Sequence, residues 1–491
     1  MSLVCKRLFD QRQSYLSFNL DRLPPRDYYN EDNVTLNSYK QIINNNIDCK
    51  SQSVLVYTDD DGVIDMDYDC GYYIDSALSD NESWKQEVLG LVMVDHIHFR
   101  DCKDNAFDET FWNGVIGLLD TLRARYPSII ITASLTYMTQ SMRDVPLTEL
   151  SVEEDQPGDI NIIQTYQYPP TLTKLMISRL YWVDPRLDLT GLTSLKILQL
   201  PSLAGKPLDG SKLPSSLTDL TLTYTFNQTV SNLPPSVTNL RVLCVSNSHP
   251  INHHPTLRTL QRGKTFNMVF SSPSLPFTLL TTLRLGTIEI NDFKSIDWTL
   301  MPMLTTLSMY LTTSDTTTLI NLSALPSSIK RMEVTPCAPI ESFPDGLEYL
   351  HISFDRCSFK LVSTMWPGGI QASHIHTLST YYYIHPLCRA DLPASITTLK
   401  LFGSKCLNLD PTEYPPLLRK VEGTGRHSGH LLQTLSASPI QQMELCMDNG
   451  EGVALRRISS NIFMRIDERL VRSGFIHIDR LQTLYAEDRM M

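Results

Sequence analysis

The stretch Leu213–Leu222, Leu-Pro-Ser-Ser-Leu-Thr-Asp-Leu-Thr-Leu, recurs twenty residues later as Leu233–Val242, Leu-Pro-Pro-Ser-Val-Thr-Asn-Leu-Arg-Val. In both copies, apolar residues follow the proline at three, six and eight positions. The last two are two residues apart and therefore share one face of a β-strand. The proline cannot donate to a ladder, so it marks the chain just before that strand. Such a short unit cannot bury its apolar face alone, which predicts a solenoid of stacked copies.

Copies of this pattern extend over residues 168–446. They are opened by Pro169, Pro214, Pro234, Pro255, Pro276, Pro302, Pro326, Pro344, Pro393, Pro415 and Pro439. In the copies of Pro255, Pro276, Pro302 and Pro439, the apolar residues are displaced by one or two positions. The interval from Pro344 to Pro393 is 49 residues, about twice the usual period, so we expect one degenerate repeat near Trp366–Ile370.

We therefore predict a repeat solenoid resembling leucine-rich repeats, made mainly of short parallel β-strands with a few helices near the N-terminus. Beside the repeats, a strand is expected over Val88–Arg100, a helix over Phe111–Arg125 and a buried strand at Ile129–Ile131. The expected organisation is a helix over 1–20, an irregular acidic connector over 21–87, αβ repeats or a cap over 88–167, the repeats over 168–446, and a C-terminal cap over 447–491.

Composition and charge narrow the class of protein. With 42% apolar and 19% charged residues the chain is globular. Residues 1–160 carry 28 acidic against 13 basic residues, and the rest is nearly neutral, which argues against nucleic-acid binding. No apolar run has the length of a signal peptide or a spanning helix, so we expect a monomeric, intracellular protein, cytoplasmic or nuclear, away from membranes. The ten cysteines form no Cys-x-x-Cys pair and are expected to be buried and reduced.

A candidate binding face follows from the same alternation. Residues that stand between the inward-pointing leucines of stacked strands share the opposite, concave side of the sheet. Arginine and tyrosine are frequent anchors of protein interfaces. Threonine is also common on any exposed strand face, so the prediction concerns the face as a whole and no single residue. The residues that we assign to it are Thr221, Arg241, Arg258, Arg284, Tyr310, Glu333, His351 and Lys400.

No motif indicates catalysis, a metal or a cofactor. The acidic segment around Asp59–Gly62 lacks acids at the first and last positions of a calcium loop, so a solvated loop is expected. The histidine pairs at 96 and 98 and at 374 and 376 lack the further ligands that zinc requires. The glycines of Gly423–His430 fit no phosphate-loop spacing, and that segment is expected to be a turn. We therefore expect a protein that is not an enzyme.

The repeat unit resembles the FNIP repeat, a short relative of the leucine-rich repeat. The closest agreement is over Leu213–Gln228, where Phe226-Asn227-Gln228 follows the leucine-rich part. The resemblance covers about residues 168–446, and the tail around Gly474–His477 resembles the closing segment of such proteins. It supports the predicted fold and says nothing of the ligand.

The N-terminus resembles the closing segment of an F-box, and the residues that carry this resemblance are Leu3, Val4, Cys5 and Lys6. Only this last part of the F-box pattern is present. An F-box binds the linker subunit of a cullin–RING ubiquitin ligase, and the repeats behind it present a substrate. The resemblance thus implies a substrate-recognition adaptor that binds proteins. The alternative is an interaction scaffold unconnected with ubiquitin and without catalytic activity.

Overall fold

The computed structural model describes the chain from residue 52 to residue 481 with interruptions. The described ranges are 52–57, 72–75, 83–90, 94–101, 107, 109–136, 142–152, 167–178, 188–201, 207–223, 228–243, 254–263, 265–266, 276–313, 319–353, 374–381, 392–402, 414–424, 440–446, 452–467 and 474–481. The F-box-like residues, the acidic segment around Asp59–Gly62, the expected degenerate repeat and the Phe226-Asn227 pair lie outside these ranges.

One long sheet of 22 strands forms the body of the described protein. Up to β23 its strands are parallel, and from β3 on each pairs with the next along the chain, so the repeat solenoid is confirmed. These strands are β3 (Val94–Arg100), β4 (Ile130–Leu135), β5 (Glu149–Val152), β6 (Lys174–Ile177), β7 (Ile197–Leu200), β9 (Asp219–Leu222), β11 (Asn239–Val242), β12 (Thr259–Arg262), β14 (Thr282–Glu289), β15 (Thr306–Thr312), β17 (Arg331–Thr335), β19 (Tyr349–Ser353), β20 (Thr377–Tyr381), β21 (Thr398–Phe402), β22 (Lys420–Thr424) and β23 (Gln442–Cys446).

The predicted alternation sets the core. The first inward residue of each repeat strand is fully buried, as at Leu220, Leu283 and Leu350, and it stands beside its equivalent on the next strand. Parallel strands lie about 4.8 Å apart, so these residues form a continuous apolar row along the solenoid. Most repeat strands also carry a buried aliphatic residue at the second inward position, two residues after the first. In β12 and β20 this position holds a polar residue instead, and both Arg262 and Thr380 are buried there.

A tight turn before each strand explains the recurring proline. In the regular copies the proline carbonyl accepts a hydrogen bond from the amide of the apolar residue three positions later, as between Pro214 and Leu217. Where the proline is displaced, the turn itself keeps its place and begins at His254, Phe277 or Met301 instead. In these three repeats the proline is thus displaced by one residue from a constant turn, because the turn needs a carbonyl at its first position and no proline ring.

Hydroxyl groups join one turn to the next. The side chains of Ser216, Ser328 and Ser395, which immediately precede a buried apolar residue, each donate to a backbone carbonyl of the preceding repeat at 2.7–2.8 Å. Buried carbonyl groups outside the sheet would otherwise remain unpaired at a cost of about 1–3 kcal/mol each. The repeated serine therefore satisfies the backbone between layers.

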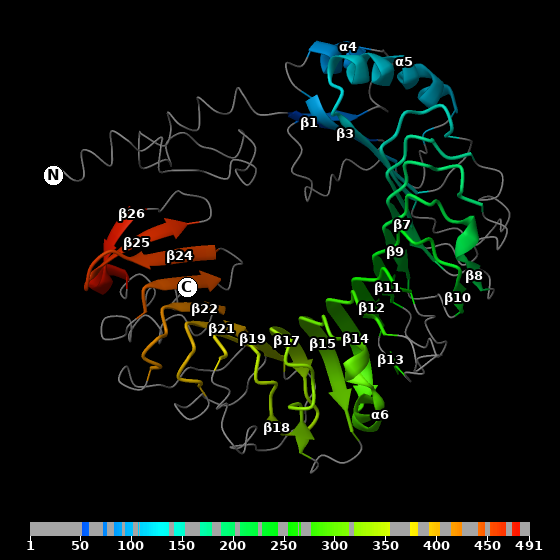
Figure 1. Ribbon diagram of the computed structural model, residues 1–491. Helices are drawn as coiled ribbons and strands as arrows, with labels where there is room; N and C mark the ends of the chain where they lie inside the picture. Colours follow the sequence, from blue (N-terminus) through cyan, green and yellow to red (C-terminus); the bar gives the residue numbers. More distant parts are fainter. Residues whose placement is uncertain are drawn as a thin grey trace.

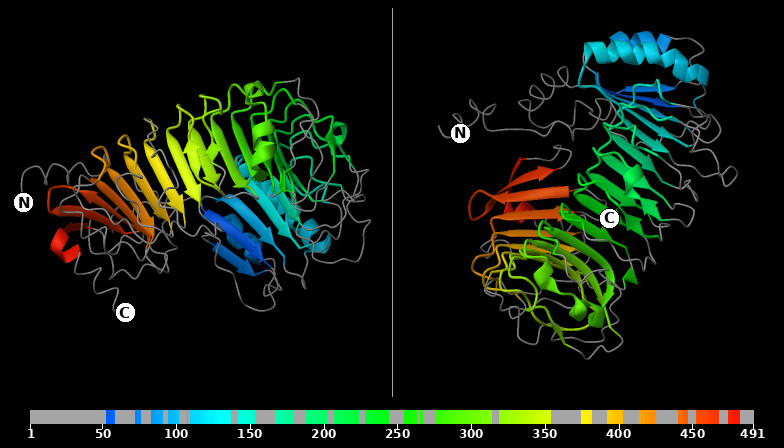
Figure 2. Two further views of the ribbon diagram at one scale, coloured as in Figure 1. Left: turned by 90° about the horizontal axis from the view of Figure 1, so that it is seen from below. Right: turned by 45° about the vertical axis from the view of Figure 1, so that its right-hand side comes forward.

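The sheet lines the inner side of a strongly curved body (Figure 1). Helices α4 (Ser83–Gly90) and α5 (Glu109–Arg125) cover its outer side at the N-terminal end, where Trp112 and Phe107 pack on Phe99 of β3. Farther along, the outer side carries α6 (Ile290–Ser295) and the pairs β8 (Leu208–Asp209) with β10 (Val230–Ser231) and β16 (Ile320–Asn321) with β18 (Ile340–Ser342). Figure 2 shows the strands side by side along the whole curve. No described helix has the length and apolar character needed to cross a membrane.

At the C-terminal end the strands pair in antiparallel fashion. Strands β24 (Gly452–Arg457), β25 (Ile462–Asp467) and β26 (Gly474–His477) are antiparallel and continue the sheet from β23. Phe463 of β25 is buried, whereas Phe475 of the last strand is 72% exposed. The parallel repeat strands thus end at β23, and the sheet continues in antiparallel strands.

The N-terminal end differs from expectation at two places. Val88 lies in helix α4 and the strand begins only at Val94, because Leu89 and Gly90 end a helix whose buried side is Trp84 and Val88. The segment expected as an irregular connector contains β1 (Gln52–Tyr57) and β2 (Tyr72–Asp75), which pair in parallel with each other, while β1 also pairs with β3. The sheet therefore begins earlier than the repeats indicated. The helix predicted over Phe111–Arg125 is confirmed. The strand expected at Ile129–Ile131 runs over Ile130–Leu135 instead, and Ile130 is exposed because it points away from the buried side that holds Ile131.

Candidate protein-binding face

One row of side chains runs along the middle of the concave side, and we call it the middle row. It consists of the residues between the two inward positions of each strand, and the strand register places them next to one another. From β5 to β23 its members are Ser151, Met176, Gln199, Thr221, Arg241, Gln261, Arg284, Ser308, Glu333, His351, Ser379, Lys400, Glu422 and Glu444. Six of the eight residues assigned from the sequence lie in it, namely Thr221, Arg241, Arg284, Glu333, His351 and Lys400.

Arg258 and Tyr310 lie outside the middle row, Arg258 just before a strand and Tyr310 on one. The middle-row position of β12 belongs to Gln261, and Arg258 precedes the strand by one residue, so its assignment to this row was wrong. The error arose because the displaced Pro255 shifts the apparent register. Tyr310 lies two residues beyond the middle row on β15, aligned with Thr335, and is 51% exposed.

A second concave row was missed in the sequence. It stands two residues before the middle row and includes Glu149, Lys174, Asp219, Asn239, Arg331, Tyr349 and Lys420. Its members alternate with the buried positions as the middle row does. The sequence pattern contains this second row, because its members directly precede the first inward residue of each strand. It was missed because the strands were expected to start one residue later.

Ion pairs fill the C-terminal part of this face. Glu422 accepts from Lys400 of the neighbouring strand at 2.6 Å and from Lys420 of its own strand at 2.8 Å, and Lys420 also reaches Glu444 at 2.6 Å. Burial raises the pKa of the Glu422 carboxyl, but the hydrogen bonds from Lys400 and Lys420 outweigh this and hold the pKa below its usual value. The positive and negative charges of β21–β23 are therefore largely paired with one another.

On β17 and β19, neighbouring side chains hold Arg331 and His351 in place. The Arg331 guanidinium donates to Glu333 at 2.9 Å and stacks 3.9 Å from the ring centroid of Tyr349. His351 Nδ1 lies 2.7 Å from Ser379 Oγ, and burial lowers the pKa of its imidazole. These side chains present a structured surface, because each is held by a neighbour on the same or the adjacent strand.

The N-terminal part of the face holds the first histidine pair. His96 Nε2 and His98 Nδ1 lie 2.9 and 2.6 Å from the hydroxyl of Thr132 on β4. Burial lowers the pKa of His98 to about 4, with smaller contributions from His96 and Arg100, so its ring is neutral at neutral pH. Nearby, burial raises the pKa of the Asp101 carboxyl to about 6, although Asp101 accepts from the amide of Thr136 at 2.5 Å. The hydroxyl of Thr132 thus lies within hydrogen-bonding distance of both histidines.

The other sequence candidates do not converge on one site. His374 is exposed, and His376 Nδ1 lies 3.3 Å from the Ser395 carbonyl. Gly423 belongs to β22, and residues 425–430 lie outside the described ranges. Within the described ranges, no group of three His, Cys, Asp or Glu side chains is placed to hold a metal ion.

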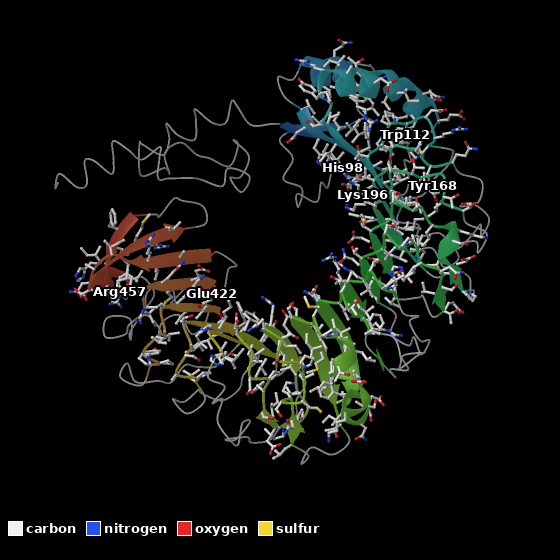
Figure 3. All side chains as sticks on the ribbon, viewed as in Figure 1. His98, Trp112, Tyr168, Lys196, Glu422 and Arg457 are labelled. Atoms are coloured by element: carbon white, nitrogen blue, oxygen red, sulfur yellow. The ribbon has the colours of Figure 1, made fainter. Side chains whose placement is uncertain are left out.

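Figure 3 shows how these side chains lie on the curved body. His98, Lys196 and Glu422 lie along the inner side, although they come from widely separated parts of the chain. Trp112 and Tyr168 lie in the body behind the sheet (Figure 3), and both are buried. The concave side therefore brings together polar side chains spread over more than 300 residues of sequence.

The fold defines the class of protein: a parallel β-solenoid, an architecture typical of repeat proteins that bind other proteins on an extended concave surface. No family model matches the chain, and no curated protein has a significantly similar sequence.

Proposed function

We propose that this protein is a binding protein without catalytic activity, and that the concave side of its sheet holds another protein. The observation that carries this proposal is the middle row, a continuous line of side chains on a curved sheet that are polar at every position except Met176. A rigid sheet positions side chains without the ordering cost that a flexible loop would incur on binding. Tyr310, Arg241 and Arg284 are exposed on it and are of the types that anchor interfaces.

Photo-cross-linking can test the position of this interface. A photoreactive amino acid replaces Thr221 or Ser308 on the concave side, and Ser295 on the outer helix α6 as the control. We expect the same cross-linked partner from both concave positions and none from Ser295. Equal cross-linking from all three positions, or cross-linking from Ser295 alone, would contradict the proposed face.

The finer proposal is a substrate-recognition adaptor of a cullin–RING ubiquitin ligase. It is supported by the F-box-like residues Leu3–Lys6, which precede the repeats in the order expected of such an adaptor. The N-terminal segment would bind the linker subunit, and the concave face would hold the substrate. The competing proposal is a scaffold unrelated to ubiquitin, which shares the concave face and lacks the linker contact.

Co-precipitation of the endogenous protein, probed for the cullin linker subunit, separates the two proposals. The matched control replaces Leu3 and Val4 by aspartate, which leaves every strand of the sheet unchanged. We expect the linker subunit with the native chain and its loss with the variant. Absence of the linker subunit from both would leave the scaffold.

A further inference from the structure

Three arginines on adjacent strands of the concave side have no ion-pair partner among the described residues. We call Arg241, Arg258 and Arg284 the arginine patch. Arg241 and Arg284 both pair with Gln261 of the strand between them, so their backbones lie about 10 Å apart. Arg258 stands at the entrance to that middle strand, and all three residues are exposed. The patch thus spans three adjacent strands, β11, β12 and β14.

Charge pairing distinguishes this patch from the rest of the face. Lys174 pairs with Glu149, Arg331 with Glu333, and the lysines of β21 and β22 with Glu422 and Glu444. Within the described ranges, none of the three patch arginines forms an ion pair or a side-chain hydrogen bond. In the described part of the face, the three patch arginines therefore keep positive charge that no ion pair offsets.

The nearby carboxylates do not cancel the patch. From β7 to β15 the strands of the long sheet contain two acidic residues, Asp219 and Glu289. Asp219 already accepts from Asn239 at 2.6 Å and from Thr218 at 2.6 Å. Glu289 lies five residues beyond Arg284, at the end of β14 next to α6. Lys196, at the inner side in Figure 3, adds a further positive charge at the edge of the patch.

We propose that the arginine patch, together with the exposed ring of Tyr310 on the next strand, docks an acidic, extended segment of the partner protein. This inference rests on the proposed function and adds the chemistry of the partner. Guanidinium groups bind carboxylates with two parallel hydrogen bonds, and the patch offers three of them at the spacing of a sheet. Tyr310 offers a large, rigid apolar surface beside them.

A nucleic acid fits these observations less well. Proteins that bind a phosphate backbone neutralise many phosphates along a concentrated basic surface. Here the patch is three arginines wide, and the ion-paired surface of β21–β23 and the histidines of β3 lie on either side of it. An acidic peptide needs only a few carboxylates opposite the patch.

The test uses the full-length protein and fluorescein-labelled peptides, followed by fluorescence anisotropy. The probes are a twelve-residue peptide of alternating glutamate and serine, its lysine–serine counterpart, a single-stranded oligonucleotide, and a peptide of residues 58–71 of this chain. The patch variant is R241Q/R258Q/R284Q. The control variant, R125Q/R143Q/K294Q, removes the same charge from exposed residues that lie off the sheet.

We expect the glutamate peptide to bind and the lysine peptide not to bind, with weaker binding at higher salt because exposed charges are screened. The patch variant should lose at least tenfold in affinity, whereas the control variant should stay within twofold. Equal affinity of both variants for the glutamate peptide would overturn the inference. So would tighter binding of the oligonucleotide, or of the peptide 58–71, which would point to nucleic acid or to an intramolecular contact.

The results distinguish a failure of this inference from a failure of the proposed function. If the glutamate peptide does not bind while the photoreactive residue at Thr221 still captures a partner, the concave interface stands and the acidic partner is excluded. If neither is observed, both proposals fail. Circular dichroism of both triple variants confirms that they remain folded, since all six side chains are exposed.

Discussion

Lys420 and Glu422, two residues apart on β22, form an ion pair in which Nζ lies 2.8 Å from one carboxylate oxygen. The other oxygen of Glu422 accepts from Lys400 on the adjacent strand at 2.6 Å, and the Glu422 side chain is 13% exposed. One carboxylate thus separates two lysines on neighbouring strands. Its removal would leave these two positive charges beside each other.

We predict that Glu422→Gln destabilises the protein by about 1 kcal/mol at neutral pH, because partly buried charge pairs are worth more than exposed ones. The pKa of the Glu422 carboxyl is held below its usual value, so its stabilising contribution is present at neutral pH and is lost as pH falls through that lowered pKa. The stability difference between native and variant protein should therefore shrink in acid. Urea unfolding at several pH values measures it, and Glu348→Gln, in the exposed pair with Lys330, is the control.

His98 should make the fold sensitive to mild acid. Its pKa, lowered by burial to about 4, lies below the usual value of about 6.5, so between these pH values the unfolded chain binds a proton that the folded protein does not. Stability should then fall as pH decreases through this window, by up to about 3 kcal/mol from this residue. Asp101, whose pKa burial raises to about 6, gives the opposite slope, so native protein must be compared with His98→Gln. A difference between the two that does not change with pH would contradict the prediction.

Gly210 stands where a side chain does not fit. A Cβ atom there would lie 2.5 Å from the backbone oxygen of Asn232 and 2.7 Å from the Cα of Leu233, both in the next repeat. Asn232 itself has a positive φ of 51°, which asparagine tolerates better than most residues. We expect Gly210→Ala to cost about 1–3 kcal/mol, because two backbones must move apart.

Gly191 is the matched control for Gly210, since a Cβ atom there would meet nothing within 4 Å. Thermal melting of Gly210→Ala and Gly191→Ala side by side should show a lowered midpoint only for the first. Equal midpoints would mean that the contact between β8 and β10 adapts without cost.

Leu220→Asp tests the repeat register. Leu220 is 1% exposed and lies between the equivalent leucines of β7 and β11, so an aspartate would be buried without a partner. We expect a loss of at least about 3 kcal/mol and faster amide exchange in those three strands. Ser215→Asp, at an exposed turn position, should melt like the native protein. An unchanged melting profile for Leu220→Asp would refute the assigned register.

The spacing of apolar residues after each proline predicted the repeats correctly where the proline begins the turn before the strand. The spacing from Pro214 to Leu220 and Leu222 identified both the turn and the inward residues, because the alternation of a strand has a period of two. It misplaced Arg258, since the turn of that repeat begins at His254 and the proline was taken as the reference. It also missed β2 and the parallel pairing of β1 with both β2 and β3, because these contacts join segments that lack the repeat pattern.

The sequence by itself determined that short strands stack with Leu220 and its equivalents inward and Thr221, Arg241 and Arg284 outward, because side-chain direction in a strand follows from position alone. Only the tertiary structure decided which charges on the concave side are paired. Charged residues occupy the same strand positions in β11–β14 and in β17–β23. The strand register brings Lys400, Glu422 and Lys420 together, whereas within the described ranges no carboxylate forms an ion pair with the arginine patch. That distinction depends on distances between strands, which no single repeat contains.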